Sequence, residues 1–129
     1  SKVGIDQLNS ISKKERLNVT GLVGDIFAFD NYQDFDIVLL DSMFHFEKRD
    51  LKRETNLIDK ILKRINKNGL ICFCIQDTGK KVRILKDTID NSGIDYETLN
   101  DSSLIYNFED KESGHKSETK YCMYIIKKK

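Results

Sequence analysis

Two short apolar runs on either side of a long amphipathic segment constrain the fold of this chain more than any other feature. The runs are FDIVLL at 35–40 and LICFCI at 70–75, and each is continuous rather than alternating. Strands that are apolar on both faces belong in a covered, parallel sheet. Between them, residues 50–67 place apolar side chains three and four positions apart and charged ones on the other face, which predicts a helix that Asn68 and Gly69 end. The sequence therefore predicts a strand–helix–strand crossover unit.

Further elements are predicted on both sides of this unit. Before it we expect a short strand at 2–5, a helix carrying Leu8, Ile11 and Leu17, and a strand at 19–24. After it we expect a helix at 81–92, extended segments at 94–99 and 104–108, a polar loop and a final strand at 121–126 that closes an antiparallel hairpin. This order predicts one α/β domain over residues 1–129, with a Rossmann-like, mostly parallel sheet and flanking helices.

Composition and charge exclude several classes of protein. The net charge of +1 argues against a dedicated nucleic-acid binder. No apolar run approaches the roughly 18 residues of a membrane-spanning helix, and the first residues do not resemble a secretory signal. Cys72 and Cys74 fall on the same side of one predicted strand, where they act either as small buried hydrophobes or in a metal or redox role. We expect no membrane association and a reducing, cytoplasmic location.

Three carboxylates follow predicted strands. Asp6, Asp25 and Asp41 each stand at the carboxyl end of a strand expected to be parallel. Ligands of open α/β sheets bind outside these ends, and a carboxylate there can accept bonds from ribose hydroxyls or from an amino group. The alternative is that each aspartate caps a turn or helix through backbone N–H groups. Their common position favours a nucleotide-like ligand.

The sequence resembles the class I S-adenosylmethionine-dependent methyltransferases, from the family's second strand onward. VGID at 3–6, GLVGDIFAF at 21–29 and FDIVLLDSMFHF at 35–46 resemble the second, third and fourth strands with the motifs that follow them. INKNGLICFCIQD at 65–77 resembles the fifth strand and the turn before it, and residues 114–129 resemble the terminal hairpin.

The resemblance implies S-adenosylmethionine as cofactor and assigns roles to single residues. By position, Asp6 would hold the ribose hydroxyls, and Gln7 and Leu8 would line the adenine side. Asp25 would contact the adenine amino group, with Ile26 against the ring.

Asp41, Ser42 and His45 match the point at which the family faces both the methionine part of the cofactor and the methyl acceptor. His45 is the candidate base, because its intrinsic pKa suits proton transfer near neutral pH; the alternative is that it packs between Phe44 and Phe46. We expect no metal site, since the two histidines are 70 positions apart and no cysteine pair has zinc-ligand spacing.

The family's glycine-rich loop and its first strand, which lies between the second and the fourth, have no counterpart here. We expect that the domain is incomplete at its amino terminus; alternatively another chain completes the sheet, or the remaining strands close up and the cofactor site is lost. The leading hypothesis is a methyltransferase, or its carboxyl-terminal portion, that acts on a small-molecule acceptor. The alternatives are a non-catalytic module that binds a partner chain through an exposed sheet edge, and a nicotinamide enzyme, whose glycine-rich fingerprint is also absent.

Overall fold

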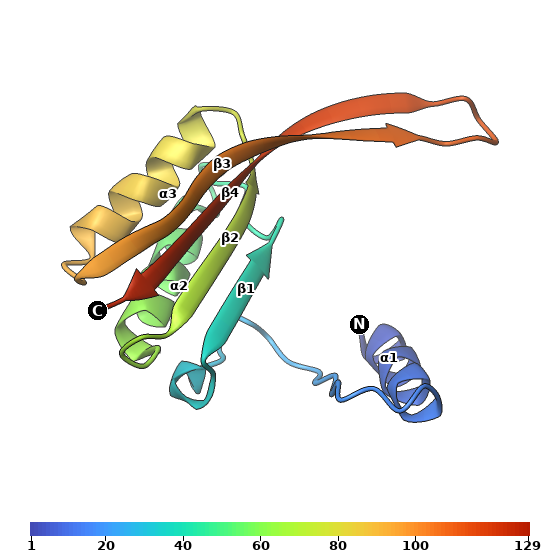
Figure 1. Ribbon diagram of the computed structural model, residues 1–129, viewed down its shortest axis with the longest axis horizontal. Helices are drawn as coiled ribbons and strands as arrows, with labels where there is room; N and C mark the ends of the chain where they lie inside the picture. The colour runs from blue at the N-terminus through green and yellow to red at the C-terminus, as the bar shows by residue number, and fades with distance from the viewer.

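A four-stranded sheet with two helices on one side forms the body of the protein, and the computed structural model describes all 129 residues (Figure 1). The elements in chain order are α1 (Lys2–Lys14), the short 3₁₀ turn η1 (Tyr32–Asp34), β1 (Ile37–Asp41), α2 (Leu51–Arg64), β2 (Leu70–Gln76), α3 (Lys80–Asn91), β3 (Tyr96–Glu109) and β4 (Lys116–Lys128). The strand order is β1-β2-β4-β3. The β1–β2 pair is parallel, and β4 runs antiparallel to both of its neighbours.

The predicted crossover unit is confirmed in β1, α2 and β2. Leu39 pairs with Cys72 in the parallel register, and the apolar stripe of α2 faces the sheet. The helix ends at Arg64, and Asn68 takes a left-handed conformation with φ of 68° just before the next strand. At Gly69 a Cβ atom would come within 2.5 Å of Ile65, so only glycine allows the chain to turn this closely under the helix.

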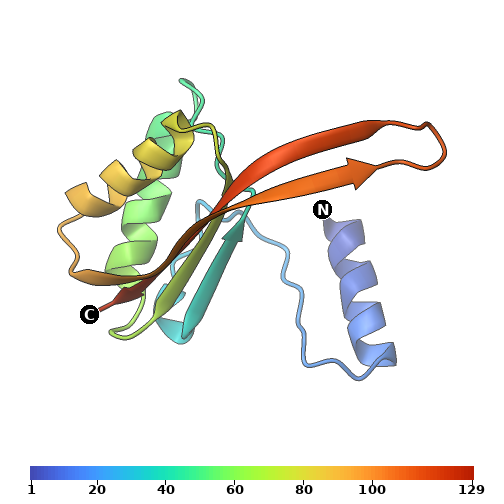
Figure 2. The same ribbon diagram turned by 45° about the horizontal axis from the view of Figure 1, so that its top comes forward.

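The hydrophobic core lies between the sheet and the two helices α2 and α3, which cover the same face (Figure 2). Alternate residues of β1, β2 and β4 point into it, including Leu40 of β1, Phe73 of β2 and Tyr124 of β4, all at most 4% exposed. The period-2 alternation of the strands therefore leaves the intervening residues on the opposite face.

A long antiparallel hairpin ends the chain. The two predicted extended segments at 94–99 and 104–108 form one continuous strand, β3, with an irregularity in register between Thr98 and Asn100. The pairing of β2 with β4 stops at Tyr121, so residues 105–120 form a two-stranded ribbon with no third strand, which we call the arm. Figure 1 shows the arm extending well beyond the rest of the sheet.

The amino-terminal strand predictions are wrong. Residues 2–5 belong to α1, where Ser1 caps the first turn and accepts a bond from the Gly4 N–H. Residues 19–24 belong to no helix or strand. A strand needs a neighbour, and neither segment pairs with one. Residues 2–5 form helical hydrogen bonds instead, and α1 lies apart from the sheet (Figure 2).

The expectation that β1 is covered on both faces is also wrong. Ile37 and Leu39 are 58% and 64% exposed, on the face opposite the two helices. The sheet is mixed rather than mostly parallel, because the two amino-terminal strands that would have extended its parallel part do not form. The Rossmann-like α/β class itself is confirmed.

Candidate functional site

Asp41 marks the candidate site, at the carboxyl end of β1. Its carboxylate is exposed, and one oxygen accepts a hydrogen bond of 3.0 Å from the Ser42 hydroxyl. The chain turns sharply here, because Ser42 has a φ of 53° while its N–H donates to the Cys74 carbonyl at 2.8 Å. The carboxylate of Asp41 has further lone pairs that can accept bonds from a cationic or amino group.

A hollow of about 420 Å³ lies next to this carboxylate. Most of its wall is apolar, and it is contributed by the sheet and by the base of the hairpin. The lining residues are Asp41, Ser42, Cys74, Leu104, Ile105, Tyr106, Tyr121 and Met123. An apolar hollow with one carboxylate at its rim suits an organic ligand that carries a positive or hydrogen-bonding group.

Glu54 of α2 shapes the loop that follows Asp41. Its side chain is 4% exposed, and its two oxygens accept the backbone N–H groups of His45 at 3.1 Å and Phe46 at 2.7 Å. The rings of Phe44 and Phe46 stack on each other with centroids 5.6 Å apart. The His45 side chain is exposed, so the alternative that it packs between the two rings is wrong.

The two cysteines of β2, Cys72 and Cys74, have thiol pKa values above the ordinary one. Burial raises the pKa of Cys72 above its ordinary value. Burial first, and then the hydrogen bond and charge of Asp41, raise the pKa of Cys74. Neither thiol is therefore activated as a nucleophile or a metal ligand, and no group of three or more histidine, cysteine, aspartate or glutamate side chains is placed to hold a metal ion.

The structure does not bring Asp6 and Asp25 to Asp41. Asp6 lies on α1 with Gln7 and Leu8, and it pairs with Lys2 one turn earlier at 2.7 Å. Asp25 lies in a turn, where its carboxylate accepts the Phe27 N–H at 2.9 Å. The expectation that both end parallel strands is therefore corrected, and Asp25 makes the local cap that was its alternative.

Asp25 and Ile26 nevertheless adjoin a hollow of their own. About 340 Å³ in volume, it is lined by residues 22–26 and by Phe29. The segment is fixed to α2 because the Lys60 ammonium donates to the carbonyls of Phe27 and Phe29 at 2.7 and 2.8 Å. The Asp25 region is thus attached to the body of the protein, whereas α1 is not.

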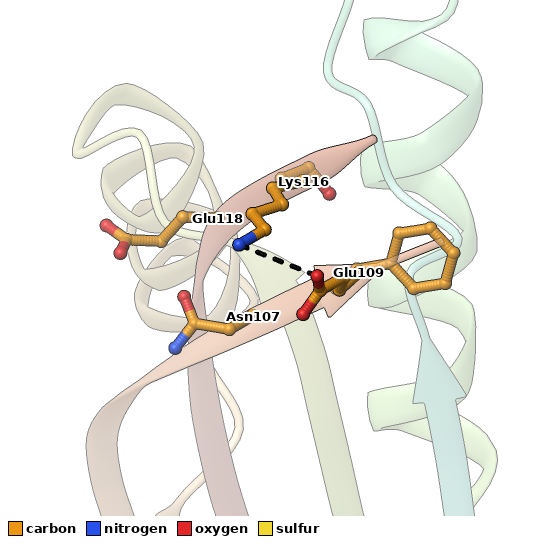
Figure 3. A pocket seen from close by; sticks show the side chains of 6 residues that line it. Asn107, Glu109, Lys116 and Glu118 are labelled. Carbon is orange, nitrogen blue, oxygen red and sulfur yellow. Dashed lines mark ion pairs between the residues drawn. The ribbon is translucent and has the colours of Figure 1, made fainter. Parts of the chain in front are cut away.

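A further hollow, of about 480 Å³, lies far from the strand ends, on the arm (Figure 3). Asn107, Glu109, Lys116 and Glu118 surround it, and Lys116 pairs with Glu109 at 3.5 Å. All four side chains are exposed and polar. They form the solvated surface of a hairpin rather than a ligand site.

Sequence reasoning missed Glu54 and the apolar wall. A signal for Glu54 was present, because it stands three residues after Leu51 and three before Leu57, inside the apolar stripe of α2. A carboxylate at a core position predicts a buried acceptor with partners. Tyr121 and Met123 reach the hollow through strand pairing, which no local pattern indicates.

This chain is similar to known proteins in its fold, but not in its sequence. No family profile and no curated protein matches the sequence. TehB from Haemophilus influenzae superposes with a TM-score of 0.69 at 19% identity, over 100% of this chain and 48% of its own. A precorrin-6y C5,15-methyltransferase from Geobacter metallireducens gives 0.53 at 15% identity, over 94% of this chain and 60% of its own.

SMU.776, assigned to the methyltransferases and solved in complex with S-adenosylhomocysteine, gives a TM-score of 0.59 at 20% identity, over 92% of this chain and 34% of its own. The chain therefore has the α/β fold of the class I S-adenosylmethionine-dependent methyltransferases. It spans about half the length of TehB and still less of SMU.776, and it corresponds to part of that fold. No helix combines the length and apolar character that crossing a membrane requires.

Proposed function

We propose that this chain forms part of an S-adenosylmethionine-dependent methyltransferase that acts on a small-molecule acceptor. One observation carries the proposal: the exposed carboxylate of Asp41 stands at the carboxyl end of a parallel strand, beside an apolar hollow. In open α/β sheets this is the edge at which ligands bind. The methyltransferase fold supports the choice of ligand.

The polar groups of Asp41 and Ser42 fit the methionine part of the cofactor. S-adenosylmethionine supplies a methyl group on a positively charged sulfur, which leaves by direct displacement. The Asp41 carboxylate would accept the amino group of the methionine part, and the Ser42 hydroxyl, now bonded to Asp41, would orient that carboxylate. The apolar side chains of Tyr106, Tyr121 and Met123 would contact the acceptor, and holding the reactants in line is the main contribution of such a site.

His45 is the proposed base where the acceptor must lose a proton. Its exposed imidazole lies on the loop that Glu54 holds, four residues beyond Asp41. The expected contacts of Asp6, Gln7 and Leu8 with the adenosine part of the cofactor stay predictions, and so do the expected contacts of Asp25 and Ile26 with adenine. Because Asp6, Gln7 and Leu8 lie on α1, their contacts require α1 to move relative to the sheet.

Nuclear magnetic resonance titration with S-adenosylhomocysteine tests the proposal, because it detects weak binding residue by residue. We expect the amide signals of Asp41, Ser42 and Cys74 to shift. Asp41→Asn should abolish these shifts. Asp36→Asn is the matched control, since Asp36 is also exposed but precedes the amino end of the same strand. Shifts that spare Asp41, or that survive Asp41→Asn, would contradict the assignment.

A second candidate function is a non-catalytic module that binds a partner polypeptide. The specific observation in its favour is the unpaired edge of β1 beside an exposed apolar face. Binding of a polypeptide without any binding of S-adenosylhomocysteine would favour this candidate.

A further inference from the structure

The two outer edges of the arm differ in charge. The edge formed by β4 carries a charged side chain at every second position, in Lys116, Glu118 and Lys120. The edge formed by β3 has no charge and no proline over residues 102–108, where the sequence is SSLIYNF. Charged side chains and bulges keep sheet edges from pairing with other chains. This part of β3 has neither, because the irregularity in its register ends at Asn100, nearer the body of the protein.

The backbone of this β3 edge has a defined set of free hydrogen-bonding groups. The Asp110 N–H donates to the His115 carbonyl at 2.8 Å, at the tip of the arm. In an antiparallel ladder, every second residue bonds to the same neighbour. The even-numbered residues of β3 in the arm therefore bond to β4. The N–H and C=O groups of the odd-numbered residues from Ser103 to Glu109 point outward, where the sheet has no further strand.

The side chains beside these groups are mostly apolar and exposed. Leu104, Tyr106 and Phe108 lie on one face of the arm. Ile105 lies on the other face, which it shares with Asn107 (Figure 3). The four apolar side chains are between 45% and 61% exposed. An exposed, uncharged edge of this kind favours the addition of another strand.

A second copy of this chain can supply that strand, and symmetry fixes its direction. Two copies that join through the same edge are related by a two-fold axis. Such an axis requires both strands to make identical hydrogen bonds. The residues of an antiparallel pair exchange their bonds in this way, whereas the slanted bonds of a parallel pair do not. The two β3 edges would therefore pair antiparallel.

Side-chain pairing selects the register. With the axis at Tyr106, Leu104 lies opposite Phe108 of the second copy. Ile105 then lies opposite Asn107, so that outward backbone groups meet outward backbone groups. No two like charges lie opposite each other, and apolar side chains meet across the axis on one face.

The two neighbouring registers are less favourable. With the axis at Ile105, Asp101 would lie opposite Glu109, and like charges directly opposite each other are destabilising. With the axis at Asn107, the apolar Leu104 would lie opposite the charged Asp110.

We propose that the arm joins two copies of this chain through antiparallel pairing of their β3 edges about Tyr106. The two arms then form one four-stranded sheet, and the two bodies lie at its opposite ends, because each arm extends well beyond its own body (Figure 1). Leu104 and Tyr106 also line the hollow beside Asp41, so the second copy brings its Phe108 to the rim of that hollow. That the hollow receives a methyl acceptor rests on the proposed function, whereas the pairing does not.

A cysteine placed on the axis tests both the pairing and its register. The backbone groups of Tyr106 bond to β4, so the two copies of this residue form a non-hydrogen-bonded pair with Cα atoms about 4.5 Å apart. A disulfide spans this distance. Tyr106→Cys should therefore give a disulfide-linked dimer on mild oxidation, well above the level of the parent chain. Phe108→Cys, on the same face of the same edge, is the matched control, since its two copies would lie about 13 Å apart along the strands. Equal yields from the two variants would overturn the proposal.

Sedimentation velocity and residue-resolved amide hydrogen exchange test the association without a cross-link. We expect the parent chain to dimerise, with the amides of Ile105 and Asn107 at least tenfold slower in the dimer than in the monomer. Tyr106→Lys should be monomeric, because two like charges would meet at the axis. Ser117→Lys, at an exposed position on the other edge of the arm, should dimerise like the parent.

Three results would overturn the proposal. They are a parent chain that stays monomeric at about 1 mM, a dimer that survives Tyr106→Lys, and a dimer that protects the amides of β1 instead of those of Ile105 and Asn107. A dimer that passes these tests but does not bind S-adenosylhomocysteine would confirm the pairing and count against the proposed function.

Discussion

Single side chains hold the candidate site in place. Glu54 is the main example, because it satisfies two backbone N–H groups in the loop after β1 and lies among apolar residues of α2. A buried carboxylate with two such bonds stabilises one loop conformation, whereas the same carboxylate without them would oppose folding. The position of His45 relative to Asp41 thus depends on a residue of another element.

Glu54→Gln should destabilise the protein by about 1–3 kcal/mol. The amide has only one oxygen, so its NH₂ group would face a backbone N–H that also donates. The free energy of unfolding from urea titration measures the effect. Asp59→Asn is the control on the same helix, because Asp59 makes a surface ion pair with Lys63 and should cost less than about 1 kcal/mol. Equal losses for the two variants would contradict the role of Glu54.

The Cys74 thiol reports the charge of Asp41. Because the hydrogen bond and charge of Asp41 help to raise the pKa of Cys74, Asp41→Asn should lower that pKa and increase the thiolate fraction at a given pH. Alkylation by iodoacetamide at Cys74 should become faster. Cys72 serves as an internal control, since burial alone raises its pKa and its rate should not change. A Cys74 rate that is unchanged or slower would show that the two groups do not interact.

At the scale of elements, a hydrogen bond and an ion pair, which together we call the tie, connect the end of β2 to the hairpin and fix the wall of the hollow beside Asp41. Asp77, just after β2, accepts a bond of 2.8 Å from the Ser103 hydroxyl and lies 3.3 Å from the Lys120 ammonium. The bond from Ser103, and then the Gly79 N–H and Lys120, lower the pKa of Asp77 against the effect of burial. Ser103 and Lys120 both lie at the base of the arm, so this tie orients Leu104 and Tyr121.

Ser103→Ala should raise the pKa of Asp77 toward its ordinary value. A lowered folded-state pKa stabilises the protein above the ordinary pKa of aspartate, and this contribution is lost as the pH falls through the lowered value. The variant should therefore lose less stability than the parent between neutral and acidic pH. Carbon-detected titration of the Asp77 carboxyl group measures the shift directly, and an unchanged pKa would contradict the tie.

Some of the elements could be predicted from the sequence, and others could not. The β1–α2–β2 unit was predictable because its patterns are local: two apolar runs, one amphipathic stripe and a glycine stop. The strands at 2–5 and 19–24 were predicted wrongly because strand formation depends on a neighbouring strand, which the pattern of one segment cannot supply. For the site, Asp41 followed from its place after an apolar run, whereas its apolar surroundings depend on pairing between distant strands.

At the scale of the whole molecule, the structure consists of a packed body and an amino-terminal part that hardly contacts it. The hydrogen bonds that leave α1 go to the segment directly after it: Ser12 donates to the Leu17 and Val19 carbonyls, and Asn9 bonds with Gly21. The core contains no residue before Ile26. The sheet, by contrast, is covered on one face, and its two edge strands, β1 and β3, have no neighbour on their outer sides.

Deletion of residues 1–18 should therefore change the free energy of unfolding of the body by less than about 1 kcal/mol, because it removes no core side chain. Urea titration of the shortened chain, followed by tyrosine fluorescence, measures this. A large loss would show that α1 packs on the sheet in solution.

The central claim is that the Asp41 carboxylate contacts the cofactor at the carboxyl end of β1. Calorimetric titration of S-adenosylhomocysteine into the chain and into its Asp41→Asn variant tests this claim most directly. We predict binding at least tenfold weaker in the variant, a loss of about 1.4 kcal/mol. Equally tight binding by both proteins, or binding by neither, would contradict the account.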